Sequence, residues 1–183
     1  LYAMSLLLLL SAVILVPYGP QPDVVDTYLA DLARQPLSYP ERVAVVARDA
    51  VGTVYRDGPL GEGPGGTYDS DPLIDLACAD CVTYVEQCLA LAASSDYKET
   101  EEKLQQIRYA GGVVDFATRN HFMVADWLAE NAWCVEQTKA LGVPVAQVTR
   151  TISKRDFFQR VKAPALGHDV ADRDVTVSYI PVA

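Results

Sequence analysis

The sequence predicts an α+β domain, with helices through most of the chain and strands near its end. Two observations lead to this fold class. Apolar residues recur three or four positions apart over most of the chain, which is helical spacing, and alternate with polar residues only near the C-terminal end. Half of the 183 residues are hydrophobic, and the roughly 160 that follow an apolar start suffice for one core. We therefore expect a single domain over residues 23–183.

The first 22 residues differ from the rest. Residues 6–16 form an apolar run interrupted only by Ser11, and a proline-containing segment follows. This run is short for a membrane span, which needs about 20 residues, and fits the core of a secretory signal. We expect residues 1–22 to be a signal peptide; an N-terminal anchor is the alternative, because the usual basic leader is missing. The protein is then exported to the periplasm or cell envelope and touches the membrane only through this segment.

Helix signals follow in order. Asp23 is expected to cap a first helix whose apolar stripe continues to Leu32. Ser38 and Glu41 have the spacing of a capping box, which predicts a second helix through Ala50. The later expectations are a helix over 100–109, a turn at Gly111-Gly112, a short strand over 113–117, a helix over 120–131, a strand over 145–152, and a strand with Val175, Val177 and Tyr179 on one face.

Between these segments, Asp80 and Cys81 open a strongly helical run. The apolar positions of this run lie three or four residues apart, which is helical spacing: Val82, Val85, Leu89 and Ala92. Asp80 is a good N-cap, so Cys81 becomes the first helical residue, beside free N–H groups and the positive end of the helix dipole. A thiol there ionises more easily, and the thiolate is the nucleophile. Cys81 is therefore a candidate catalytic nucleophile; the alternative is a buried small apolar residue.

An exported protein enters an oxidising compartment, where its cysteines can form disulfides. Which of the four cysteines would pair is open: Cys78, Cys81, Cys88 and Cys134. Cys78-Ala-Asp-Cys81 has the spacing of a redox dithiol, although the Gly/Pro-rich loop before it is not the strand that such a site follows. Cys81 and Cys88 lie about 10 Å apart along one helix, which is too far for a disulfide. One C-x-x-C without a second ligand pair predicts no metal site.

Net charge is −9 at pH 7, which disfavours nucleic acid as a partner because phosphate backbones are bound by basic surfaces. No motif indicates a cofactor.

Six short segments occur in order along the chain: Gly52-Thr53-Val54-Tyr55, the run from Asp80 to Glu86, its continuation from Leu89 to Ala92, Ile107-Arg108-Tyr109, Asp115-Phe116-Ala117 and Arg119-Asn120-His121. Together these segments resemble a known family, the N-acetylmuramoyl-L-alanine amidase-like branch of the NlpC-type papain-like cell-wall hydrolases. The resemblance covers about residues 25–180. Two departures are Val54, where the family often has proline, and Cys78, where the family usually has a residue without a thiol.

The resemblance implies a papain-like fold with the nucleophile at a helix N-terminus. It also implies that Cys81 cleaves the amide between the lactyl group of N-acetylmuramic acid and L-alanine in peptidoglycan fragments (muropeptides), the expected partners. Tyr55 matches a tyrosine that lines the nucleophile's loop in related enzymes, or else packs a turn. Tyr55, Asp80, Arg119 and Asn120 are expected at the substrate. The nearest alternative is a related stem-peptide hydrolase such as a γ-D-glutamyl endopeptidase.

Which residue acts as the catalytic base is open, because His121 can be assigned two different roles. From the residues alone, His121 is the better of the chain's two histidines, with Asn120 or Asp126 to orient it; His168 lies in a loop-like context. The resemblance implies instead a catalytic histidine on a later strand, in a His-x-Gly setting that does not occur before Ala183. His121 then binds substrate or is structural, and the catalytic sheet is incomplete in this chain.

Two functions of other classes remain open. One is a non-catalytic muropeptide-binding relative that kept the fold and lost the base. The other is a thiol-disulfide protein that uses Cys78 and Cys81.

Overall fold

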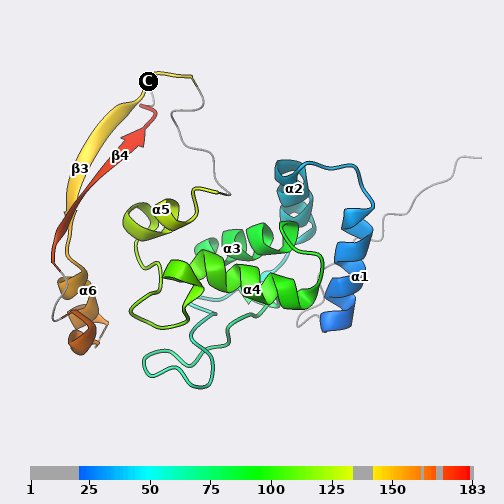
Figure 1. Cartoon of the computed structure of the whole chain (residues 1–183), viewed down its shortest axis with the longest axis horizontal. Coiled ribbons are helices and arrows are strands. Elements are labelled where there is room, and N and C mark those ends of the chain that lie inside the picture. The colour runs from blue at the N-terminus through cyan, green and yellow to red at the C-terminus, as the bar shows by residue number, and fades with distance from the viewer. Residues whose placement is uncertain (1–20, 134–141, 162, 168–170, 182–183) are drawn as a thin grey trace, which may run out of the picture.

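The computed structural model describes residues 21–133, 142–161, 163–167 and 171–181. Its architecture is α+β, as predicted. Four helices form one group: α1 (Pro22–Ala33), α2 (Tyr39–Asp49), α3 (Cys81–Ala92) and α4 (Tyr97–Arg108). Helix α3 packs against both α2 and α4, and α1 packs against α4. Figure 1 shows these helices together on one side of the molecule.

The strands form two small sheets. Strands β1 (Val54–Tyr55) and β2 (Cys78–Ala79) pair in parallel just before α3. Strands β3 (Ala146–Ile152) and β4 (Arg173–Tyr179) form an antiparallel hairpin. This hairpin stands to one side of the helical group in Figure 1, with α6 (Lys154–Arg160) at one end of it. Both late strands are confirmed. Strand β3 begins one residue after its expected start, and β4 contains Val175, Val177 and Tyr179.

Short elements connect the helical group to the hairpin. After α4 come a 3₁₀ turn, η1 (Ala110–Gly112), one π-helical turn, η2 (Met123–Trp127), and α5 (Leu128–Glu130); a second 3₁₀ turn, η4 (Pro164–Gly167), follows α6. The turn predicted at Gly111-Gly112 is confirmed, because both glycines have positive φ, which other residues rarely adopt.

The core lies on both sides of α3. One cluster joins α1, α2 and α3, and its buried members are Val25, Leu29, Leu32, Val46, Leu76, Cys88, Leu91 and Ala92. The other joins α3, α4 and η2, and its buried members are Leu60, Leu89, Ala90, Leu104, Ile107 and Trp127. Because α3 is covered on two faces, nearly its whole circumference is apolar from Cys88 onward.

Several element predictions were wrong in detail. The first helix begins at Pro22 rather than after Asp23, because proline is well suited to the first helical position; Gln21 is its N-cap. The helix expected over 100–109 begins at Tyr97, where Asp96 accepts a bond from the backbone N–H of Glu99. The capping box of Ser38 with Glu41 is confirmed.

The expected strand over 113–117 is a turn. The Asp115 carboxylate accepts from the backbone N–H of Ala117, and the Thr118 hydroxyl donates to the carbonyl of Asp115 at 2.8 Å. Such local side-chain bonds compete with a sheet ladder. The helix expected over 120–131 begins only at Met123.

Val82 and Val85, on the first turns of α3, are 36% and 46% exposed. The leader over residues 1–20, Cys134 and His168 lie outside the described residues. No helix of the described part is both long and apolar enough to cross a membrane.

Candidate functional site

Cys81 is exposed at the first position of α3, directly after strand β2. The parallel pairing of β1 with β2 places Tyr55 opposite Ala79, two residues before the thiol. Tyr55 is 71% exposed, so it does not pack a turn in the described fold. The backbone N–H of Arg56 donates to the carbonyl of Ala79 at 3.1 Å, which extends this pairing. Strand pairing therefore brings the Tyr55 loop to the start of α3.

Asp80 caps this helix. Its Oδ1 accepts from the backbone N–H of Val82 at 2.9 Å and of Thr83 at 2.7 Å, while its own N–H donates to the Thr83 hydroxyl at 2.8 Å. Its Oδ2 accepts from the N–H of Gly58 at 3.3 Å, which ties the preceding loop to the cap. The predicted N-cap is therefore confirmed.

The cap restricts which amides an incoming substrate can use. We expected several backbone N–H groups at the start of α3 to be free, but Asp80 occupies those of Val82 and Thr83. No bond within the described residues involves the N–H of Cys81. Among the first-turn amides of α3, that of Cys81 is therefore the donor left free for a ligand.

A cavity of about 140 Å³ lies beside the start of α3. Asp80, Arg119 and Asn120, three of the residues predicted to contact substrate, all line it. They come from the cap of α3 and from the segment after α4, so the fold brings together residues about 40 positions apart in the sequence. Tyr55, Cys81 and His121 are not among its lining residues, although Asp80 and Val82 on either side of Cys81 are.

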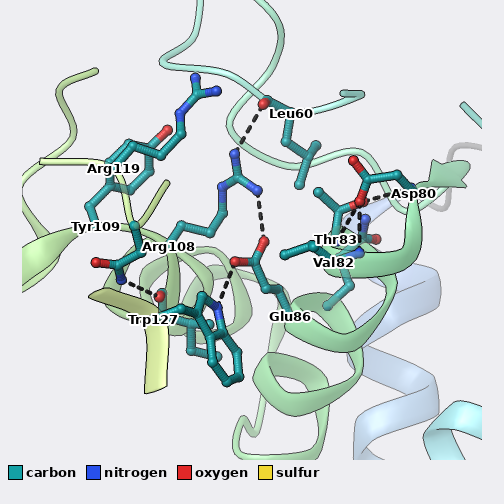
Figure 2. A network of polar contacts seen from close by, with 12 residues as sticks. Leu60, Asp80, Val82, Thr83, Glu86, Arg108, Tyr109, Arg119 and Trp127 are labelled. Atoms are coloured by element: carbon teal, nitrogen blue, oxygen red, sulfur yellow. Dashed lines mark hydrogen bonds and ion pairs between the residues drawn. The ribbon is translucent and has the colours of Figure 1, made fainter. Parts of the chain in front are cut away.

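A buried ion pair, Glu86 with Arg108, also lines this cavity. Neither residue was predicted from the sequence to be part of a site. Arg108 Nη1 donates to Glu86 Oε2 at 2.8 Å, and both side chains are about 5% exposed or less. Trp127 Nε1 donates to the other Glu86 oxygen at 2.8 Å, and Arg108 Nη2 donates to the carbonyl of Leu60 at 3.0 Å. Figure 2 shows Glu86 between the arginine and the indole.

Burial raises the pKa of Glu86, and the opposing attraction of Arg108 acts to lower it. One signal in the sequence marks this residue. Glu86 is the single charged position in the otherwise apolar and neutral helix Cys81–Ala92, and a charge is seldom buried unless it is paired.

Arg119 joins the same region to the loop before α3. Its guanidinium bonds to Glu62, with Nε at 2.8 Å, and its Nη2 lies 2.8 Å from Asp69 Oδ2. Glu62 Oε1 also accepts from the Tyr109 hydroxyl at 3.2 Å. Burial raises the pKa of Glu62 although Arg119 opposes the shift. Gly66 permits the tight loop, since a Cβ there would lie 2.1 Å from the carbonyl oxygen of Asp69.

Asn120 is held by the end of α4. Its side-chain amide donates to the carbonyl of Ile107 at 3.0 Å, and its backbone N–H donates to the carbonyl of Arg108 at 2.9 Å. These bonds fix the segment that carries Arg119 and Asn120 beside the buried ion pair.

His121 lies in an aromatic cluster. Its ring centroid is 4.7 Å from that of Phe116, 4.6 Å from Phe157 and 5.6 Å from Phe158. Nε2 lies 2.7 Å from the carbonyl oxygen of Phe116, so this nitrogen carries the hydrogen and donates it. Burial lowers the pKa of His121 to about 4, so the ring is neutral at pH 7.

Within the described residues, no hydrogen bond joins His121 to Cys81. Asp126, expected as an orienting group, instead pairs with Lys154 at 2.9 Å and Arg173 at 3.3 Å. The surroundings of His121 are those of a packing residue, and its role as base stays a prediction.

The other described thiols are buried. Cys78 Sγ donates to Asp75 Oδ2 at 3.3 Å, and burial followed by this bond raises the pKa of the thiol. Burial raises the pKa of Cys88 to about 12. Cys78, Cys81 and Cys88 are all free. The raised pKa of Cys78 is the opposite of what thiol–disulfide exchange at this motif would need.

Comparison with known families bears on the whole arrangement. Residues 45–183 match the model of the AmiA-like family, described as N-acetylmuramoyl-L-alanine amidase-like. The chain belongs to this family. The match includes β1, β2, α3 and every residue that lines the cavity. The family part of the resemblance seen in the sequence is thereby confirmed.

Solved structures share the fold. A Legionella pneumophila protein assigned to the family DUF1460 has a TM-score of 0.75 and 24% identity, over 87% of this chain and 62% of its own. An N-acetylmuramoyl-L-alanine amidase from Bacteroides uniformis has a TM-score of 0.54 and 20% identity, over 74% of this chain and 64% of its own. A second structure with the same description has a TM-score of 0.52 and 18% identity, over 78% of this chain and 65% of its own.

The chain thus spans less than two thirds of the length of the structures that it resembles. No curated protein matches it.

Proposed function

We propose that this protein is a cysteine amidase of peptidoglycan fragments, with the papain-like arrangement of NlpC-type hydrolases and Cys81 as nucleophile. The observation that carries the proposal is the placement of an exposed thiol at the first position of α3, beside a cavity lined by Asp80, Arg119 and Asn120. Family membership supports the choice of substrate, because the family is described by the N-acetylmuramoyl-L-alanine bond. We propose the periplasm or cell envelope as its location, because the family is described by a bond of peptidoglycan.

The chemistry follows from the geometry. The thiolate of Cys81 attacks the carbonyl carbon of the lactyl amide, and the N–H of Cys81 donates to the oxyanion that forms. The C–N bond then breaks, the amine of L-alanine leaves with a proton from the base, and the acyl group stays on Sγ as a thioester. Water hydrolyses the thioester, which releases the muramoyl carboxylic acid and restores the thiol.

The base must take the thiol proton and return it to the leaving amine. Because His121 is neutral, buried and bonded to the Phe116 carbonyl, we propose that the base lies outside the described residues and that His121 is structural. Arg119 and Asn120 then contribute to the substrate side of the cavity.

The test uses Cys81→Ala in the full-length protein, with N-acetylmuramoyl-L-alanyl peptides as substrate and chromatography of the products. We expect hydrolysis to fall by about a thousandfold or more, since the nucleophile is lost. Cys88→Ala is the control for losing a thiol from the same helix and is expected to keep its turnover. Undiminished hydrolysis by Cys81→Ala would overturn the assignment.

A second candidate is a binding protein without catalytic activity, and the absence of His121 from the cavity lining favours it. Muropeptide binding by the full-length protein with no hydrolysis at any pH between 5 and 9 would support this candidate over the amidase.

A further inference from the structure

A second cavity, of about 640 Å³, lies where the segment after α4 meets the junction of β3 with α6, and we call it the α6 groove. Figure 1 shows α6 at one end of the hairpin. Five of its lining residues bear on what it can bind: Phe122, Ile152, Asp156, Gln159 and Arg160. The last three are exposed, so solutes can reach the groove. Its volume lies within the range of about 300–1,000 Å³ that is usual for small-molecule sites.

The fold does not use the polar side chains of the α6 groove. Within the described residues, no hydrogen bond or ion pair involves the side chain of Asp156, Gln159 or Arg160. The carboxylate can only accept hydrogen bonds, the guanidinium can only donate them, and the amide does both. A ligand with several hydroxyl groups, each of which both donates and accepts, matches this set.

The two charges of the α6 groove oppose the binding of an ion. Asp156 and Arg160 are four residues apart on α6, so they are neighbours on one face of the helix. An anion attracted by Arg160 is repelled by Asp156, and a cation meets the reverse. The groove therefore favours a neutral polar ligand.

Phe122 and Ile152 add an apolar surface to the α6 groove. The Phe122 ring packs on that of Phe157 with the centroids 5.2 Å apart, which holds it in place. A pyranose ring has apolar C–H faces and carries its hydroxyl groups at the edge. An uncharged sugar can therefore lie against the apolar surface while its hydroxyls bond to the three polar side chains.

The α6 groove borders the same stretch of chain as the cavity beside α3. Asn120 lines that cavity, and Phe122 lines the groove. Two residues of chain span at most about 7 Å, so these two side chains come from backbone positions that are close together. In the proposed substrate, the scissile amide likewise has a sugar on one side and a peptide on the other.

We propose that the α6 groove is a subsite for the N-acetylated sugars of the glycan, and that through it the protein selects sugar-bearing fragments over bare peptides. The inference deepens the proposed function and rests on it for the identity of the sugar. A hydrolase of bonds within the stem peptide would need no such subsite.

The first test is calorimetric titration of full-length Cys81→Ala with tri-N-acetylchitotriose, a chain of N-acetylated sugars that the protein need not hydrolyse. We expect binding at millimolar concentration. Adding Arg160→Ala should weaken binding by about tenfold, because it removes a charged donor. Arg155→Ala is the matched control and should leave binding unchanged, since it removes the same charge from an exposed position of α6 that does not line the groove.

No binding of the trisaccharide, or equal weakening by the two arginine variants, would overturn the inference. Displacement of the trisaccharide by inorganic phosphate would show that Arg160 binds an anion, and would overturn it as well. Because nothing is hydrolysed in these titrations, their result does not depend on whether Cys81 is the nucleophile.

Steady-state kinetics then place the sugar relative to the scissile bond. The substrates are an N-acetylmuramoyl-L-alanyl peptide and the matching lactyl-L-alanyl peptide, which keeps the amide and lacks the sugar. We expect Arg160→Ala to raise KM by about tenfold for the first substrate only and to leave kcat unchanged. An equal rise for both substrates would mean that the groove holds the peptide, and no rise for either would mean that the substrate does not enter it; both results would overturn the inference.

Discussion

The three described thiols occupy three different environments. Cys81 is exposed at a helix start, Cys78 is buried and bonded to Asp75, and Cys88 is in the core beneath α2. Burial raises the pKa of Cys88 to about 12, so this thiol stays protonated near neutral pH. Thiol reactivity therefore separates these positions without any assumption about substrate.

Native protein treated with iodoacetamide should be alkylated first at Cys81. We expect labelling of Cys78 and Cys88 to be slower by about a hundredfold or more, because both are buried and have raised pKa values. Peptide mass spectrometry over a time course measures this order. Labelling in 6 M guanidinium chloride, where burial is lost, provides the control and should bring the rates together; equal rates in the native protein would contradict the burial described above.

His121 makes stability depend on pH in a stated window. Its pKa in the fold is about 4, below the value of about 6.5 for an exposed histidine, so between these pH values the unfolded chain binds more protons than the folded one. Stability from the neutral ring is therefore present above pH 6.5 and lost as the pH falls toward 4. We expect a loss of about 2 kcal/mol across that window.

The measurement is urea unfolding of wild type and His121→Gln at pH 7 and pH 4.5. Glutamine keeps a donor for the Phe116 carbonyl but does not titrate, so the variant should show a smaller decrease in stability. A decrease as large as that of the wild type would show that carboxylates account for the acid sensitivity instead.

Two helix caps of the same chemistry serve different purposes. Asp80 caps α3 beside the cavity and also holds Gly58, whereas Asp96 caps α4 through the N–H of Glu99. Both bonds satisfy first-turn amides that otherwise have no partner. Only the first cap touches the cavity.

Replacement of each cap by alanine should separate stability from activity. We expect Asp80→Ala and Asp96→Ala each to lower the free energy of unfolding by about 1 kcal/mol. Asp80→Ala should also lower kcat/KM by about tenfold or more, because the loop at Gly58 and the start of α3 lose their connection, while Asp96→Ala keeps its kcat/KM. Equal kcat/KM values for the two variants, measured at a temperature where both are folded, would contradict a role of the Asp80 cap at the site.

In the complete fold, an aromatic cluster and one buried carboxylate connect the helical group to the hairpin. Phe157 and Phe158 of α6 pack on Phe116 and His121, which follow α4. Asp126 of η2 pairs with Lys154 of α6 and Arg173 of β4. The placement of the hairpin thus depends on contacts made by a few side chains.

Loss of the most buried of these rings should be costly. Phe158 is 1% exposed, so Phe158→Ala leaves a cavity between α6 and the segment after α4, and we expect about 3–5 kcal/mol of destabilisation. Val161→Ala, at the exposed end of the same helix, should cost less than about 1 kcal/mol. Chemical unfolding measures both, and a small effect of Phe158→Ala would mean that α6 does not support the fold.

Much of the local structure followed from the residues alone. The caps at Ser38 and Asp80, the helix that begins at Cys81 and the two late strands were all predicted, because capping and alternation are short-range signals. The strand expected over 113–117 was not found, because Asp115 and Thr118 bond within a turn instead.

The candidate site shows where sequence reasoning stops. The sequence predicted a thiol at a helix start, and it predicted Asp80, Arg119 and Asn120 as residues that contact substrate. These predictions depend on residue type and on resemblance to a family. The buried Glu86–Arg108 pair and the aromatic surroundings of His121 came from the packing of α3 against α4 and of α6 on Phe116. Burial and long-range contacts set desolvation, pairing and pKa, and neither is encoded in local periodicity.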